Sequence, residues 1–300
     1  MSAWLTGIEG TDAGHVLALA LALAAAVLHA FFGALQKGRH DPWLSRGAMD
    51  ASYGLIAAPF ALFVVPWPEA GLWPILAAAF AIHTTYKIAQ AMAYVRGAYT
   101  VVYPVVRGSS PVFTVLGAGL LFGESFSLQQ WLGVGLLVGG ILGLASCNLR
   151  ALTPGRETMG AALGLAVATG VLVAAYTTWD AYGIRSTGDP FTFLAWFFLL
   201  DGIAMPVIAA VRYRNMAPRP APGALMARGL LGGVVALASF GAIMLATRLD
   251  KVGEAAVLRE TSVVFAALIG WLVLKEHVGL VRLALIALIA LGAVIVETGS

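Results

Sequence analysis

The chain has 300 residues, of which 60% are hydrophobic and only 11% are charged, and its formal net charge is +3. A soluble domain carries roughly twice that share of charged residues, so the composition excludes an ordinary soluble protein. The small positive excess suits loops that face lipid headgroups and indicates no nucleic-acid partner. Cys147 is the single cysteine, which excludes an internal disulfide and offers no metal-site spacing. We therefore expect no metal and no other cofactor.

Apolar runs of about 20 residues recur along the chain, and each is long enough to cross a hydrocarbon core of about 30 Å as a helix. No Lys or Arg precedes the first run, so we expect it to remain as a membrane helix and not to be cleaved as a signal peptide. The predicted spans are residues 14–37, 46–66, 71–94, 98–122, 128–148, 158–181, 190–211, 226–247, 252–274 and 278–297. The sequence thus predicts an all-α integral membrane protein with ten transmembrane helices.

The two halves of the chain look duplicated. At a shift of 152 positions, the matching pairs are Arg96 with Arg248, Arg107 with Arg259, Ser110 with Ser262, Phe113 with Phe265 and Glu124 with Glu276. At a shift of 148, Asp41-Pro42-Trp43 matches Asp189-Pro190-Phe191. We expect two five-helix repeats, residues 1–148 and 158–300, joined by a linker over residues 149–157. Because five is odd, the second repeat enters the membrane from the opposite side, and such inverted repeats enclose a site near the midplane.

The distribution of Lys and Arg among the predicted loops indicates an orientation. The side shared by both termini has Arg185, Arg248 and Lys251. The other side has Lys37, Arg39, Arg46, Arg96, Arg150, Arg156, Arg212, Arg214, Arg219, Arg228 and Lys275. Since cytoplasmic loops carry the excess of basic residues, the sequence predicts an inner-membrane protein with both termini outside, in the periplasm.

With this organisation, the chain resembles the drug/metabolite transporter superfamily, specifically its EamA-type branch. The residues that carry the resemblance are His29-Ala30 leading to Lys37 and Asp41-Pro42, then Tyr103-Pro104-Val105-Val106-Arg107-Gly108, Gly123-Glu124 and Lys275-Glu276. The resemblance covers nearly the whole chain, and its motifs are diffuse. It implies alternating-access carriage of metabolites such as amino acids, often as efflux. Family members are often described with cytoplasmic termini, whereas the loop charges here favour termini outside.

Ionisable side chains at membrane depth are costly, so each one is expected to face a cavity or a partner. Lys87, Arg107, Asp201, Arg259 and Glu260 fall near the middle of predicted spans, and His29 and His83 lie close to the same level. The complete set of predicted substrate-binding or coupling residues is Lys87, Arg107, Arg259, Glu260, Asp201, His83, Tyr86, Tyr103, Ser110 and His29. Three of these residues are cations and two are carboxylates, which favours a substrate with an acid group.

Polar residues form one stripe on each of two neighbouring spans. The fourth span has Tyr99, Tyr103, Arg107, Ser110 and Thr114 at helical spacing, and two prolines, Pro104 and Pro111, bend the same helix. The third span has His83, Tyr86, Lys87, Gln90 and Tyr94. Both stripes have a functional and a structural interpretation at this stage.

Arg107 can contact substrate, or it can hold helices together through a carboxylate such as Asp201. Lys87 can bind a proton or a substrate carboxylate, or it can snorkel to the interface. His29 and His83 can shuttle protons or simply pack. Tyr176, Trp179 and Asp180 can form a mouth of the path or an aromatic belt, and the belt is the favoured interpretation. Glu124 and Glu276 close their helices at turns, and a structural role is expected for both.

We therefore expect a secondary transporter, working as an exporter, of small polar metabolites with an acid group, such as amino acids or organic acids. A monomer is sufficient, the partners are the solute and the lipid bilayer, and proton coupling stays open. No Walker loop is present to couple transport to ATP. The alternatives are an exporter of lipophilic cations, which the absence of Asp and Glu between Gly14 and Lys37 disfavours, and a membrane-embedded enzyme or scaffold.

Overall fold

The computed structural model describes residues 2–36, 41–151, 156–272 and 279–299, and the described residues form helices joined by short connections. The helices are α1 (Ser2–Gly7), α2 (Asp12–Gln36), α3 (Pro42–Phe63), α4 (Leu72–Arg96), α5 (Tyr99–Phe122), α6 (Leu128–Ala151), α7 (Arg156–Arg185), α8 (Pro190–Asp201), α9 (Ala204–Arg214), α10 (Pro222–Leu249), α11 (Val252–Arg259), α12 (Ser262–Leu272) and α13 (Leu280–Thr298). The predicted all-α class is confirmed for these residues.

Each predicted span falls on helix, but two of the spans are interrupted. The span predicted over 190–211 is divided into α8 and α9 at Gly202-Ile203, and the span predicted over 252–274 is divided into α11 and α12 at Glu260-Thr261. Breaks of this kind expose backbone groups that only a protein interior or a wet cavity can satisfy in lipid. The two breaks therefore mark places where the interior of the bundle is polar.

Seven segments of the described chain are long and apolar enough to cross a membrane, which makes this a multi-pass membrane protein. They are Asp12–Gly33, Tyr99–Phe122, Leu128–Arg150, Thr158–Arg185, Pro190–Arg214, Pro222–Leu249 and Leu280–Thr298. The predicted spans outside this set are those of α3, α4 and α11–α12. These segments carry charged residues that the fold buries, among them Asp50, Lys87 and Glu260.

The start of α3 and the start of α8 are built in the same way. Asp41 accepts hydrogen bonds from the backbone N–H of Trp43 (2.9 Å) and Leu44, and Asp189 accepts one from the N–H of Phe191 (3.1 Å). In each helix a proline follows the capping aspartate, where its missing N–H costs no hydrogen bond. The sequence match between these two segments thus corresponds to a repeated helix start.

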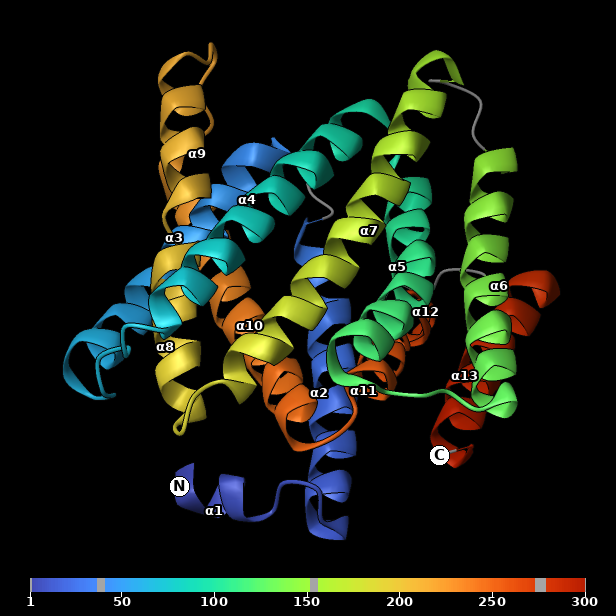
Figure 1. The fold of residues 1–300 in the computed structure, drawn as a ribbon. Helices are drawn as coiled ribbons and strands as arrows, with labels where there is room; N and C mark the ends of the chain where they lie inside the picture. Colours follow the sequence, from blue (N-terminus) through green and yellow to red (C-terminus); the bar gives the residue numbers. More distant parts are fainter. Residues whose placement is uncertain (1, 37–40, 152–155, 273–278, 300) are drawn as a thin grey trace.

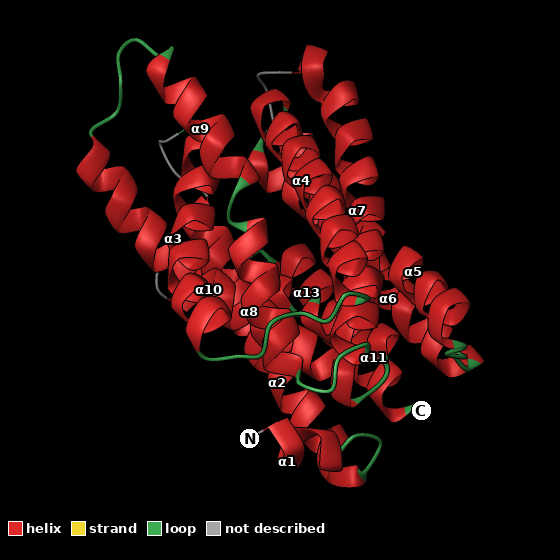
Figure 2. Ribbon diagram, turned by 60° about the vertical axis from the view of Figure 1, so that its left-hand side comes forward, coloured by secondary structure: helices red, strands yellow, loops and turns green. Residues whose placement is uncertain are grey.

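Equivalent helices of the two halves run in opposite directions. In Figure 1 both termini lie at the lower end, α2 begins at that end, and α7 begins at the upper end. We call the end that holds both termini the terminal face. Figure 2 shows both termini at the same end from a second direction. The antiparallel course of equivalent helices agrees with an odd number of crossings in each half.

The two halves contact each other extensively, with α7 against α4 and α5, α10 against α2 and α3, α13 against α6, and α8 and α9 against α3. Gly54 and Gly202, equivalent at a shift of 148, form the crossing of α3 with α8, where a Cβ on Gly202 would lie 2.7 Å from the Cα of Gly54. Gly133 and Gly292 bring α6 and α13 equally close. Small residues let membrane helices approach backbone to backbone, so both contacts are tight.

Candidate functional site

Lys87 of α4 is the centre of a buried ion network. Its Nζ lies 2.6 Å from Asp50 Oδ2 and 2.6 Å from Asp201 Oδ1, and it donates a hydrogen bond to Tyr53 Oη at 2.9 Å. It also donates to the backbone carbonyl of Asp201 at 3.2 Å, where α8 ends. The Lys87 side chain is 1% exposed, so it does not snorkel to the interface. It ties α3, α4 and the break after α8 together.

Arg46 and Tyr53 complete this network. Arg46 Nε donates to Asp50 Oδ1 at 2.8 Å, and Tyr53 Oη donates to Asp201 Oδ2 at 2.5 Å. Tyr53 and Asp201 are equivalent positions of the two halves at a shift of 148. Arg46, counted above among the loop charges, is buried in the protein, so that assignment was wrong. The excess of basic residues on the side opposite the termini persists without it.

Arg107 of α5 pairs with Glu260 and not with Asp201. Its Nε lies 2.8 Å from Glu260 Oε2, and its Nη2 donates to Ser262 Oγ at 3.4 Å. Ser110 Oγ donates to the other carboxylate oxygen of Glu260 at 3.4 Å. Glu260 lies at the break between α11 and α12, so the ion pair joins the bent helix of the first half to the broken helix of the second.

His83 of α4 pairs with Asp180 of α7. The His83 Nε2 atom lies 2.8 Å from Asp180 Oδ2, and the imidazole packs on the ring of Tyr176 with centroids 4.4 Å apart. Asp180 Oδ1 has no hydrogen-bond partner, although it is buried. Tyr176 and Asp180 are 2% and 3% exposed, so the aromatic-belt interpretation was wrong for both of them. Trp179 remains half-buried and donates to the carbonyl of Ile75.

Arg259 is the exception among the buried cations. Its Nη2 donates to Thr177 Oγ1 at 3.3 Å, and its guanidinium lies 6.0 Å from the centroid of the Tyr176 ring. Its Nε has no partner, and within the described part of the chain it forms no ion pair. A guanidinium that is 2% exposed and has no carboxylate in direct contact is costly, because its charge is desolvated and is offset only from a distance.

A small cavity lies beside Arg259. Its walls are Tyr176, Thr177, Asp180, Phe240, Ile243, Met244, Thr247 and Arg259. Its volume of about 10 Å³ is room for roughly one water molecule. An unpaired cation and a carboxylate with a free oxygen thus meet at one cavity with apolar walls, which is an arrangement that can hold a small polar solute once the helices part.

The remaining predicted residues lie around these groups. Tyr86 packs against Tyr176 with ring centroids 4.9 Å apart, and Tyr103 stacks on Tyr99 at 5.2 Å. His29 packs against Phe32 and Phe240. The structure therefore brings the ten predicted residues to one buried region, in which Lys87 with Asp201 and Arg107 with Glu260 form separate pairs.

Sequence reasoning missed Asp50 and Tyr53. The spacing of four residues between Arg46 and Asp50 is the usual spacing of a helical ion pair and was the available signal for Asp50. With Arg46, Asp50 and Asp180 included, four cations and four carboxylates balance in this region, so the positive excess counted from the sequence is absent when His83 is neutral.

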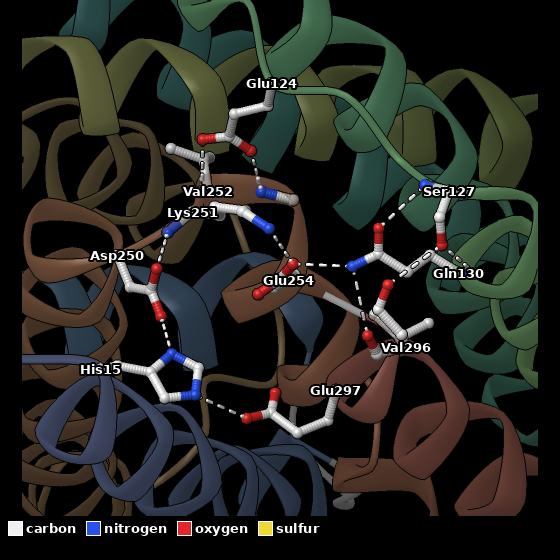
Figure 3. Close-up of polar contacts among 12 residues, drawn as sticks. His15, Glu124, Ser127, Gln130, Asp250, Lys251, Val252, Glu254, Val296 and Glu297 are labelled. Carbon is white, nitrogen blue, oxygen red and sulfur yellow. Dashed lines mark hydrogen bonds and ion pairs between the residues drawn. The ribbon is translucent and has the colours of Figure 1, made fainter. Parts of the chain in front are cut away.

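The terminal face is closed by hydrogen bonds between the two halves, drawn in Figure 3. Glu124 accepts from the first backbone N–H groups of α11, at Val252 (2.7 Å) and Gly253 (2.9 Å). Gln130 donates to Glu254 at 2.7 Å and to the carbonyl of Val296 at 3.2 Å. The expected structural role of Glu124 is confirmed, because it caps a helix of the other half; Glu276 lies outside the described residues.

These observations define a class of protein: a multi-pass, internally duplicated helical membrane protein whose broken helices surround buried charges. The family comparison agrees, because the EamA-like transporter family matches the chain twice, at residues 13–146 and at residues 160–298. The chain belongs to the EamA-like transporter family, within the drug/metabolite transporter superfamily. The two matches also confirm the internal duplication.

The fold has solved counterparts. A structure described as "Crystal structure of protein" superposes with a TM-score of 0.73 at 18% sequence identity, covering 95% of this chain and 98% of that one. At this sequence identity the similarity shows the fold alone. No curated protein matches the chain.

Proposed function

We propose that this protein is a secondary transporter, working as an exporter, of small polar metabolites with an acid group, such as amino acids or organic acids. In this proposal the solute binds near the midplane between the two repeats, and alternating access carries it across. The solute is released chemically unchanged. Membership of the transporter family supports the reaction class, and the buried charges support the substrate class.

The single observation that carries the substrate class is Arg259. Lys87 and Arg107 lie in ion pairs with carboxylates of the protein, whereas Arg259, among the described residues, donates to the Thr177 hydroxyl and faces the Tyr176 ring without an ion pair. A guanidinium is a planar donor that suits a carboxylate or phosphate in a bidentate geometry. A solute acid group would supply the direct ion-pair partner that Arg259 does not have among the described residues.

Asp180 supports the amino-acid branch of the proposal. Asp180 lines the same cavity as Arg259, and its Oδ1, which has no hydrogen-bond partner, can accept a hydrogen bond from a solute ammonium group. Phe240, Ile243 and Met244 offer an apolar wall for a side chain. Because the cavity now holds roughly one water molecule, the helices have to separate before a metabolite enters, as alternating access requires.

The direct test uses purified protein in liposomes. Liposomes loaded with an unlabelled amino acid or organic acid should take up the labelled solute by exchange, and recovered solute should be unmodified. Arg259→Gln should slow this exchange by about 10- to 150-fold, the worth of one charge-assisted hydrogen bond, while Arg259→Lys, which keeps a cation, should slow it less. Exchange of lipophilic cations only would favour the drug-exporter alternative, modified solute would favour an enzyme, and no solute movement would favour a scaffold.

The proposal includes a topology. Ten segments cross the inner membrane, because α3, α4 and α11–α12 join the seven apolar segments by burying their charges inside the bundle. Both termini face the periplasm, as the distribution of loop lysines and arginines favours. A reporter that is active only in the cytoplasm, fused after residue 300, should stay inactive, and an active fusion would reverse the orientation.

A further inference from the structure

His15 stands apart from the buried site, at the start of α2 on the terminal face. Figure 3 shows its imidazole between two carboxylates of the second repeat. The Nδ1 atom contacts Asp250 Oδ2 in the turn between α10 and α11, and the Nε2 atom lies 3.2 Å from Glu297 Oε1 on α13. The His15 side chain is 43% exposed, so water on that side reaches it.

This geometry demands a proton. A neutral imidazole has one N–H group and one acceptor nitrogen, and an ionised carboxylate can only accept. With two ionised carboxylates, one on each ring nitrogen, a neutral His15 satisfies one of them and places its lone pair against the other. The arrangement is satisfied when the imidazole carries both protons and donates to Asp250 and Glu297 together.

The other charges around His15 also favour the protonated imidazole. Glu254 of α11 adds a third carboxylate on the second repeat, partly offset by Lys251, whose Nζ lies 2.8 Å from it. Arg185 of α7 donates to the backbone carbonyl of Asp250 and leaves the Asp250 carboxylate to His15 and the N–H of Lys251. Arg248 of α10 pairs with Glu9 of the first repeat at 2.6 Å, and Asp12 at the start of α2 is exposed. The local field around His15 is therefore negative, which favours the imidazolium.

We propose that His15 is a proton-binding site that latches the terminal face: the protonated imidazole ties α2 of the first repeat to Asp250 and Glu297 of the second, and loss of the proton releases one of the two contacts. Histidine titrates near neutral pH, unlike the other residues that close this face. Glu124 and Gln130 hold α11 by further hydrogen bonds in which no histidine takes part. His15 thus makes closure of the terminal face depend on the proton concentration of that compartment.

The first test measures protonation directly in the wild-type protein. Histidine labelled with ¹⁵N in the ring reports both nitrogens, and the signal of His15 among the five histidines is assigned by its loss in His15→Gln. We expect both ring nitrogens of His15 to be protonated at about neutral pH and one to lose its proton as the pH rises. A neutral imidazole over the whole range from about pH 6 to about pH 9 would overturn the proposal.

The second test measures the latch. Spin labels at the exposed positions Ala13 and Thr298, in a Cys147→Ser background, report the separation of α2 from α13. We expect the wild-type separation to widen as the pH rises, His15→Arg to stay close at every pH because its charge is permanent, and His15→Gln to stay wide.

Glu297→Gln is the matched control, since its amide can donate to a neutral imidazole and should remove the pH dependence. Equal distances in His15→Arg and His15→Gln, or a wild-type distance that ignores pH, would contradict the latch. The latch rests on the proposed function only in its consequence, which is control of access at the terminal face. The two tests measure protonation and distance, so neither depends on transport or on the proposed solute.

Discussion

Arg107 of the first repeat and Arg259 of the second occupy equivalent positions, yet they have different surroundings. Arg107 meets the carboxylate of Glu260 at 2.8 Å. The position equivalent to Glu260, at a shift of 152, is Gly108, where a Cβ would already lie 3.0 Å from the Leu142 side chain. The first repeat therefore supplies no carboxylate for Arg259, and duplication has left one balanced and one unbalanced arginine.

This difference separates two roles of a buried cation, stabilising the fold and binding a ligand, which the sequence alone could not distinguish. A cation paired inside the protein stabilises the helices that it joins, and removing its partner leaves an uncompensated buried charge. A cation without a partner gains little for folding and is available to a ligand. The paired cations should therefore affect stability when mutated, and the unpaired one should affect transport.

The largest effect is expected from Lys87→Met, which leaves Asp201 without its cation and Asp50 with Arg46 alone. The free energy of unfolding should fall by about 3–5 kcal/mol or more, because buried carboxylates lose their counter-charge. Thermal unfolding of purified protein measures this loss. Adding Asp201→Asn should restore part of the stability, and a single mutant as stable as the wild type would show that the network is not structural.

A slightly smaller loss, about 3–5 kcal/mol, is expected from Arg107→Gln because one carboxylate, Glu260, remains buried and unpaired. The double variant Arg107→Gln with Glu260→Gln should recover most of this loss. If the melting temperature of Arg107→Gln is no lower than that of Arg259→Gln, the paired arginine does not stabilise the fold more than the unpaired one.

Arg259→Gln should instead leave the melting temperature nearly unchanged and lower the kcat/KM of transport by about 10- to 150-fold, the worth of one charge-assisted hydrogen bond. Exchange rates in liposomes and thermal unfolding of the same preparation measure the two effects together. Full transport by a folded Arg259→Gln protein would remove Arg259 from the proposed solute site.

The smallest effect is expected from Glu124→Ala, which removes the acceptor at the first N–H groups of α11. Loss of a helix cap costs about 1 kcal/mol, so a modest drop in melting temperature is expected. The neighbouring exposed Ser125→Ala serves as the control and should change nothing. A Glu124 variant indistinguishable from this control would mean that the capping contact contributes no stability.

Several features were predictable from particular residues. The match of the Asp-Pro pairs at 41 and 189 predicted a duplication, and in the structure both aspartates cap equivalent helices. Lys87 and Asp201 were recognised as buried because each lies in the middle of an apolar run. Their direct contact was not predictable, since Lys87 and Asp201 are 114 residues apart and either could have formed an ion pair with another residue.

The sequence by itself determined the membrane class, the duplication and the burial of charges such as Lys87 and Arg107, because hydrophobic length and helical rise are properties of a continuous segment; it did not reveal the burial of Arg46 and Asp50. The tertiary structure decided which charges pair: Arg107 with Glu260, Lys87 with Asp50 and Asp201, and His15 with two carboxylates of the other repeat. The reason is that Coulomb energy depends on distance through space. The same reason explains Arg259, which has no ion pair among the described residues: Gly108 stands at the position equivalent to Glu260, and only the packed repeats show that no carboxylate reaches Arg259 from there.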